Sequence, residues 1–222
     1  RFRTWLAGYW SQAGRPQLIG NSAARGQLAG HYARGLRATR TSRAHRTRLR
    51  NVSANVHAVA ANPKSLAKEL SKRGPRSVLR GDLALAGQPG VVYTPAEGFN
   101  LPAVAFGHGW LTNVGKYTAL FEHLASWGIV VGAPSTERGP VPSAVGLATD
   151  LHTTLDICLG VRLGTGRISV HPDRLAFVGH GFGAGAAVLA AARREVAAVA
   201  SLYPAPTSPR ASDAAAQVTA PG

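Results

Sequence analysis

Residues 176–183 read Ala-Phe-Val-Gly-His-Gly-Phe-Gly, and this stretch decides the fold class. The apolar run of residues 175–178 is typical of a buried strand, and residues 182–192 are typical of an apolar helix. Between them, glycines at positions 179, 181 and 183 relieve steric crowding where backbone segments approach closely. The stretch therefore predicts a strand, a tight turn and a helix in direct succession.

Strand and helix patterns alternate along the chain from about residue 78 onward. The predicted strands cover residues 91–93, 101–106, 129–132, 175–178 and 196–202. The predicted helices cover residues 117–127, 144–163 and 182–192. Strands that alternate with helices indicate a mostly parallel sheet with helices on both faces, so the sequence predicts an α/β fold.

The glycine turn has the spacing of the G-x-S-x-G elbow, in which a strained turn lifts a serine hydroxyl above the end of a sheet. Gly179 and Gly183 hold the two glycine positions, His180 precedes the centre, and Gly181 stands where the serine would be. Glycine adopts strained backbone angles at low cost, but it has no side chain with which to form an acyl-enzyme. The pattern predicts the shape of a hydrolytic site without its nucleophile.

Two predicted strands end in turns of similar composition, His108-Gly109-Trp110 and His180-Gly181-Phe182. Sites in α/β sheets lie at the carboxyl ends of the strands. In elbow-containing enzymes the oxyanion hole uses the N–H group after the nucleophile and one N–H group from the loop after an earlier strand. The candidate oxyanion-hole donors are therefore the backbone N–H groups of Phe182 and Trp110.

Three stretches, taken together and in this order, resemble the α/β-hydrolase fold. They are residues 102–110, 121–134 and 171–183, and the similarity covers roughly residues 90–222. Within that fold the chain is most similar to the dienelactone hydrolase, chlorophyllase and cutinase-like polyester hydrolase group. The resemblance implies an α/β-hydrolase-type sheet and descent from enzymes that cleave carboxylic esters with a Ser-His-Asp triad.

Two departures from the family pattern bear on activity. Gly181 replaces the serine, and residues 218–222 look like the lead-in to a further strand, so we expect the sheet to lack its C-terminal strands. In the family the triad acid follows that strand and the triad histidine comes later still. No residue of this sequence matches either position, and the sequence leaves open whether the chain is an enzyme.

Six further polar residues are weaker candidates for catalysis or metal binding. They are His108, His180, Ser135, Ser143, Asp150 and Asp156. We expect the histidines to shape their turns, because a catalytic histidine needs a nucleophile to serve. The serines follow a strand without lying on an elbow, and the aspartates on the long helix favour solvated or capping roles over metal binding. No metal and no cofactor is expected.

The formal charge of +15 is concentrated in the N-terminal third. Residues 1–80 contain 17 basic residues and one acidic residue, hence +16, whereas residues 81–222 contain eight basic and nine acidic residues, hence −1. Arginines recur at every third position, as Arg34, Arg37, Arg40, Arg43 and Arg46. On a helix they would form a basic stripe suited to nucleic-acid phosphates or an anionic membrane surface. The alternative is a solvated, partly disordered arm.

These patterns predict two parts. Residues 1–77 form an Arg-rich arm with a connector helix at residues 65–73, and residues 78–222 form the α/β-hydrolase-like domain, incomplete at its C-terminal end. No apolar run approaches the roughly 20 residues that span a bilayer, so we expect a soluble domain. Association with a membrane through the arm stays open, and no compartment is predicted.

Three functions are compatible with the sequence. The first is a degenerate, non-catalytic α/β-hydrolase-fold protein that acts as a binding or accessory subunit. The second is a carboxylic ester hydrolase of the dienelactone hydrolase-like group, seen as a truncated or nucleophile-altered chain. The third is a structural subunit that its basic arm tethers to a larger membrane or nucleic-acid assembly. The expected partners are an acyl, ester or carboxylate ligand and a protein that covers the unfinished sheet edge.

Overall fold

The computed structural model describes residues 63–160, 163–164 and 166–220. The arginine stripe of residues 34–46 lies outside the described residues. Of the described residues, residues 63–72 belong to one compact unit and residues 73–220 to a second, and the described part of the first unit contains one helix, α3 (Pro63–Leu70). The predicted connector helix is therefore present but begins two residues earlier, because proline is tolerated in the first turn of a helix.

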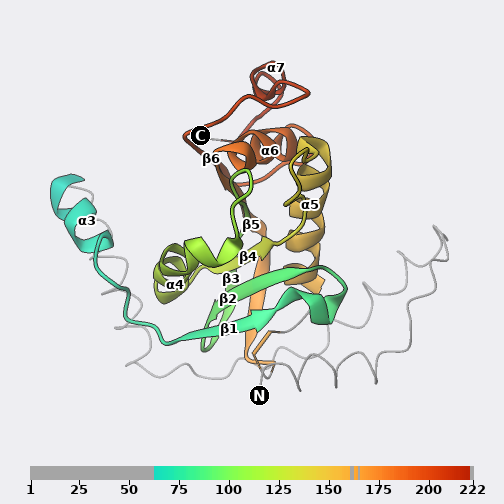
Figure 1. The fold of residues 1–222 in the computed structure, drawn as a ribbon. Helices are drawn as coiled ribbons and strands as arrows, with labels where there is room; N and C mark the ends of the chain where they lie inside the picture. The colour runs from blue at the N-terminus through green and yellow to red at the C-terminus, as the bar shows by residue number, and fades with distance from the viewer. Residues whose placement is uncertain (1–62, 161–162, 165, 221–222) are drawn as a thin grey trace, which may run out of the picture. The chain divides into compact units, whose positions relative to one another are not determined.

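The second unit is built on a six-stranded sheet whose strand order is β1-β2-β4-β3-β5-β6 (Figure 1). Strands β4, β3, β5 and β6 are mutually parallel, whereas β2 runs antiparallel to both of its neighbours. The strands are β1 (Val78–Asp82), β2 (Gly90–Pro95), β3 (Gly98–Gly107), β4 (Val130–Pro134), β5 (Ile168–His180) and β6 (Ala198–Leu202). The predicted α/β class with a mostly parallel sheet is confirmed.

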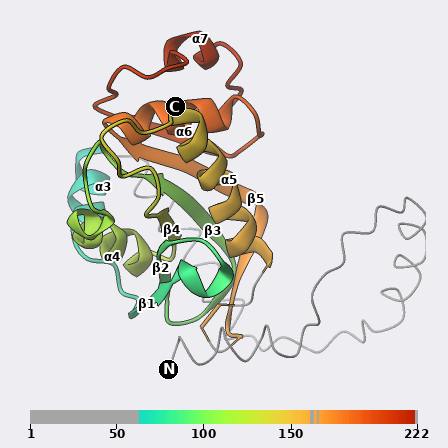
Figure 2. The same ribbon diagram turned by 45° about the vertical axis from the view of Figure 1, so that its right-hand side comes forward.

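Helices cover both faces of this sheet, also as predicted. The helical elements are η2 (Leu83–Ala86), η3 (Val114–Tyr117), α4 (Thr118–Ser126), α5 (Ala144–Gly160), α6 (Phe182–Ala191) and α7 (Ala211–Ala215). Figure 1 shows α4 and α5 on opposite sides of the strands, and Figure 2 shows α5 and α6 side by side. The element order thus gives a three-layer arrangement with the sheet in the middle.

Two separate apolar clusters fill the space between the sheet and its helices. Val130 of β4 belongs to the cluster under α5 and α6, whereas its neighbour Val131 belongs to the cluster that contains Phe121 of α4. Successive side chains of a strand point to opposite faces, so a continuous apolar run is what a strand buried on both faces requires. This explains why the central strands could be predicted from continuous apolar runs, in which apolar and polar residues do not alternate.

Several boundaries differ from the predicted ones. Strand β5 begins at Ile168, seven residues before the predicted start, because residues 168–170 also pair with β3 beyond a register shift. Strand β1 and helix α7 were not predicted. Two of the five residues of β1 are exposed and the strand lies at the edge of the sheet, and α7 buries no residue, so neither element carries an apolar pattern.

The C-terminal side of the sheet ends at β6. Among the described residues, β6 pairs with β5 alone, so its other edge is unpaired there. Residues 216–220 form turns and loop, and Val218 and Ala220 pack against the larger apolar cluster. The expectation that residues 218–222 lead into a further strand stays a prediction, because residues 221–222 lie outside the described residues.

Candidate functional site

The turn at the centre of the predicted elbow joins β5 directly to α6. Gly181 has φ 58° and ψ −117°, a combination that residues with a side chain rarely adopt. Its N–H group donates to the carbonyl oxygen of Leu202 (3.0 Å), and its own carbonyl oxygen accepts from the N–H groups of Ala184 (3.2 Å) and Ala205 (3.0 Å). Three backbone hydrogen bonds, from β6, α6 and the loop after β6, therefore fix the conformation of this residue.

Three other glycines allow the two strand ends to touch the first turn of α6. A Cβ atom at Gly179 would overlap the carbonyl group of Gly183, and one at Gly183 would overlap the carbonyl group of Gly107. A Cβ atom at Gly107 would lie 2.8 Å from the carbonyl oxygen of Gly183. The glycines predicted to relieve crowding do so at positions 179 and 183, and Gly107 belongs to the same contact.

Gly181 itself is not crowded. A Cβ atom built there has a single neighbour, the Cα atom of Gly109 at 3.8 Å. Packing therefore leaves room for a side chain, and only the left-handed backbone angle disfavours one, by about 1–3 kcal/mol. The contact also places the turn that follows β3 beside the turn that follows β5.

The predicted oxyanion-hole donors flank these two turns. Phe182 is the first residue of α6, where a backbone N–H group has no acceptor within the helix. Trp110 follows Gly109 and is 57% exposed, and its indole N–H group donates to the carbonyl oxygen of Pro140 (3.2 Å). The structure thus brings together the two turns that carry Phe182 and Trp110.

His180 is held by Tyr117. The tyrosine hydroxyl lies 3.0 Å from Nδ1 of His180 and accepts a hydrogen bond from the N–H group of Gly109 (3.0 Å). The Tyr117 ring in turn contacts Phe106, with 4.7 Å between ring centroids. One hydroxyl therefore connects the two glycine turns.

His108 joins the turn after β3 to the loop after β4. Its ring is fully buried, with Nδ1 2.9 Å from the carbonyl oxygen of Gly109 and Nε2 2.7 Å from the carbonyl oxygen of Thr136. The Thr136 hydroxyl donates to Oδ2 of Asp150 (2.6 Å) on α5. Both His108 and Asp150 thus have hydrogen-bond partners that order the loop after β4.

The remaining polar candidates also have local partners. Oγ of Ser143 accepts from the N–H group of Gly146 (2.9 Å) at the start of α5, an arrangement typical of a helix cap. Asp156 forms an ion pair with Arg194 (2.7 Å). Ser135 lines a polar cleft at the β1–β2 end of the sheet and donates its N–H group to the carbonyl oxygen of Pro89 (2.7 Å). Among the described residues, no three His, Cys, Asp or Glu side chains gather in a way that would hold a metal ion.

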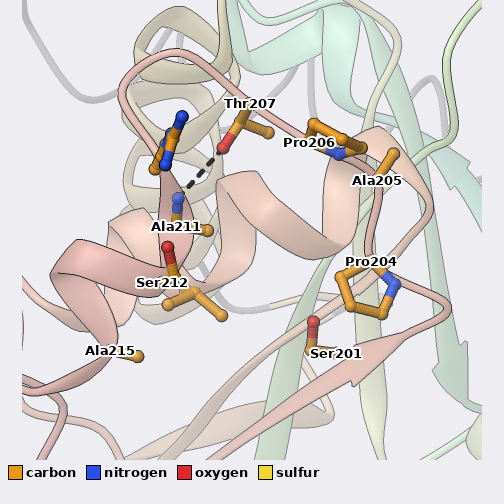
Figure 3. Close-up of a pocket in the computed structure, with 10 residues that line it drawn as sticks. Ser201, Pro204, Ala205, Pro206, Thr207, Ala211, Ser212 and Ala215 are labelled. Atoms are coloured by element: carbon orange, nitrogen blue, oxygen red, sulfur yellow. Dashed lines mark hydrogen bonds between the residues drawn. The ribbon is translucent and has the colours of Figure 1, made fainter.

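A cavity of about 620 Å³ lies next to the elbow, between α6, the end of β6 and α7 (Figure 3). Its lining is mostly apolar. The lining residues are Val188, Ser201, Pro204, Ala205, Pro206, Thr207, Arg210, Ala211, Ser212 and Ala215. Sequence reasoning missed this cavity, because the small and proline residues of the loop after β6 show neither helical nor strand periodicity.

No helix within the described ranges is both long enough and apolar enough to cross a lipid bilayer. No protein-family model and no curated protein matches the chain.

Proposed function

We propose that residues 78–222 form a degenerate α/β-hydrolase-fold domain that binds an acyl, ester or carboxylate ligand without hydrolysing it. The observation that carries the proposal is the conformation of Gly181, which has φ 58° and ψ −117° between a strand and a helix and offers no side chain. An elbow needs this strained conformation only to present a nucleophile, and the nucleophile is missing. A fold does not dictate activity, so a retained shape is compatible with binding alone.

The surroundings of Gly181 support a ligand site. The elbow motif requires a strand, a turn and a helix in succession, and β5, Gly181 and α6 have that order. The second oxyanion-hole donor of this architecture comes from the loop after β3, and Gly109 of that loop lies next to Gly181. In the proposed complex, the N–H groups of Phe182 and Trp110 donate to one oxygen atom of the ligand.

The histidines nearest the turns support the absence of hydrolysis. Nδ1 of His180 is bonded to the Tyr117 hydroxyl, and both ring nitrogens of His108 lie within hydrogen-bond distance of backbone carbonyl oxygens. A general base must hydrogen-bond to the group whose proton it takes. Gly181 supplies no nucleophile from which either histidine could take a proton.

A ¹⁵N NMR titration of the full chain with butyrate tests the proposal. We expect saturable shifts of the amide signals of Gly181, Phe182 and Gly183. Phe182→Pro removes the proposed donor N–H group while proline is tolerated at the first helical position, and Phe182→Ala keeps the N–H group as the matched control. Binding that survives Phe182→Pro as well as Phe182→Ala, or no shift at these residues in the unaltered chain, would refute the proposed site.

The second candidate function, an ester hydrolase whose nucleophile has been altered, is favoured by the free space at Gly181. The nearest atom to a Cβ there is 3.8 Å away, so a serine side chain fits. Gly181→Ser is compared in p-nitrophenyl butyrate hydrolysis with Gly87→Ser, a glycine with φ 88° that has no atom within 4 Å of a Cβ. Hydrolysis gained by Gly181→Ser alone favours the altered hydrolase, and background rates in both variants favour the binding protein.

A further inference from the structure

The cavity between α6 and α7 has the size and lining of a small-molecule site. Its volume of about 620 Å³ falls within the range of roughly 300–1,000 Å³ that is usual for ligand pockets. Apolar atoms dominate its wall, with Val188 on α6 and Ala211 and Ala215 on α7. Figure 3 shows Pro204, Ala205 and Pro206 on the loop that closes the space between the two helices.

Hydrogen bonds and close packing hold the loop in place. A Cβ atom at Gly185 would overlap the Thr207 side chain, so the loop rests directly on the backbone of α6. The Thr207 hydroxyl donates to the carbonyl oxygen of Pro209 (2.8 Å) and accepts from the N–H group of Ala211 (3.2 Å), the contact drawn in Figure 3. The Thr207 hydroxyl therefore already has two hydrogen-bond partners, and these contacts order the loop that lines the cavity.

Arg210 is the charged residue of the lining. Its side chain is exposed, and the ion pairs formed within the described part of the chain do not include it. Arginine binds carboxylates through two parallel N–H donors. The cavity therefore combines an apolar wall with one guanidinium group at the solvent side. This combination complements an amphiphilic anion, whose alkyl chain would lie against the wall and whose charged group would lie at the mouth of the cavity.

We propose that this cavity binds a monocarboxylate with a medium-length alkyl chain, whose carboxylate pairs with Arg210. The site goes beyond the proposed function, because none of its lining residues belongs to the turn of residues 179–183. An uncharged alkyl compound would gain the apolar contacts but not the ion pair, and an alkylammonium ion would be repelled. We therefore expect the affinity of the cavity to decrease from the carboxylate to the alcohol to the ammonium ion when the three compounds have equal chain length.

The test is a ¹⁵N NMR titration of the full chain with octanoate, octan-1-ol and octylammonium. We expect saturable shifts at Val188, Ala211 and Ser212, with octanoate bound about threefold more tightly than octan-1-ol. Octylammonium is expected to bind more weakly than octan-1-ol. Equal affinity for the three compounds, or no saturable shift at these residues, overturns the proposal.

Two arginine variants separate the ion pair from a general charge effect. Arg210→Gln is expected to weaken octanoate binding about threefold and to leave octan-1-ol binding unchanged. Arg174→Gln removes an exposed arginine that does not line the cavity and is expected to change neither. Equal effects of the two variants overturn the proposal. Octanoate shifts confined to residues 181–183 would also overturn it, while supporting the elbow as the ligand site.

Discussion

The backbones of Gly107 and Gly183 are in direct contact. A Cβ atom at Gly107 would lie 2.8 Å from the carbonyl oxygen of Gly183, and one at Gly183 would overlap the Gly107 carbonyl group. The end of β3 thus supports the first turn of α6, which directly follows the turn at Gly181. The contact requires glycine at both positions.

This contact predicts that Gly183→Ala destabilises the domain strongly. The methyl group would meet backbone atoms that cannot move aside cheaply, so we expect a loss of about 3 kcal/mol in the free energy of unfolding. Urea denaturation measures the loss. Gly139→Ala is the matched control, because no atom lies within 4 Å of a Cβ at Gly139. Equal stability of the two variants would show that the close contact does not exist.

A second prediction concerns the Tyr117 hydroxyl. Tyr117→Phe leaves the N–H group of Gly109 without its acceptor, and we expect a loss of about 1–3 kcal/mol in the free energy of unfolding. The amide signals of Gly109 and His180 should both shift in the variant, because the hydroxyl bonds to both residues. A variant as stable as the unaltered chain, with unchanged signals for these residues, would contradict this role.

Much of the fold was predictable, because the deciding residues lie close together in the sequence. The central strands are buried on both faces, so their sequences are continuous apolar runs. The turn at residues 179–183 is recognisable from its glycines at fixed spacing. Edge strand β1 and helix α7 were missed, because elements that bury little need no apolar pattern.

The site was predictable only in part. Glycine spacing identified residues 179, 181 and 183, but Tyr117 and His180 are 63 positions apart in the sequence and share no motif. The cavity was also missed, since it depends on how the loop after β6 rests on Gly185. Contacts between distant segments depend on tertiary packing, which local patterns do not encode.

A third prediction concerns Cys158, the single cysteine of the sequence. Its side chain is fully buried, and burial raises the pKa of the thiol to about 12. The thiolate is the reactive form, so the folded protein should not react with Ellman's reagent at pH 8. One equivalent of thiol should react after unfolding in urea. Reaction of the folded protein at the rate of a free thiol would contradict the buried position.

A fourth prediction concerns His152 on α5. Its Nε2 atom is buried without a hydrogen-bond partner among the described residues, and its ring contacts Phe177, with 5.1 Å between ring centroids. Burial, and then the neighbouring Arg194, lower the pKa of this histidine from its ordinary value of 6.5. The folded state thus disfavours the protonated ring, so its contribution to stability is present above pH 6.5 and is lost as the pH falls below it.

Urea denaturation at pH 7 and pH 5 measures this dependence. The unaltered chain should lose stability at pH 5, and His152→Phe should lose less. His123→Gln, which changes a half-buried histidine on α4, should keep the full dependence. A loss of stability at pH 5 that is the same in His152→Phe and in the unaltered chain would assign the dependence to other groups.

The initial rate of p-nitrophenyl butyrate hydrolysis by the full, unaltered chain shows whether the turn at Gly181 is catalytic. Because Gly181 offers no nucleophile and the nearby histidines are bonded within the scaffold, we predict a rate equal to that of buffer alone across pH 6–9. Saturable hydrolysis by the unaltered chain that Phe182→Pro abolishes and Phe182→Ala preserves would show that the elbow is catalytic, and would contradict the account.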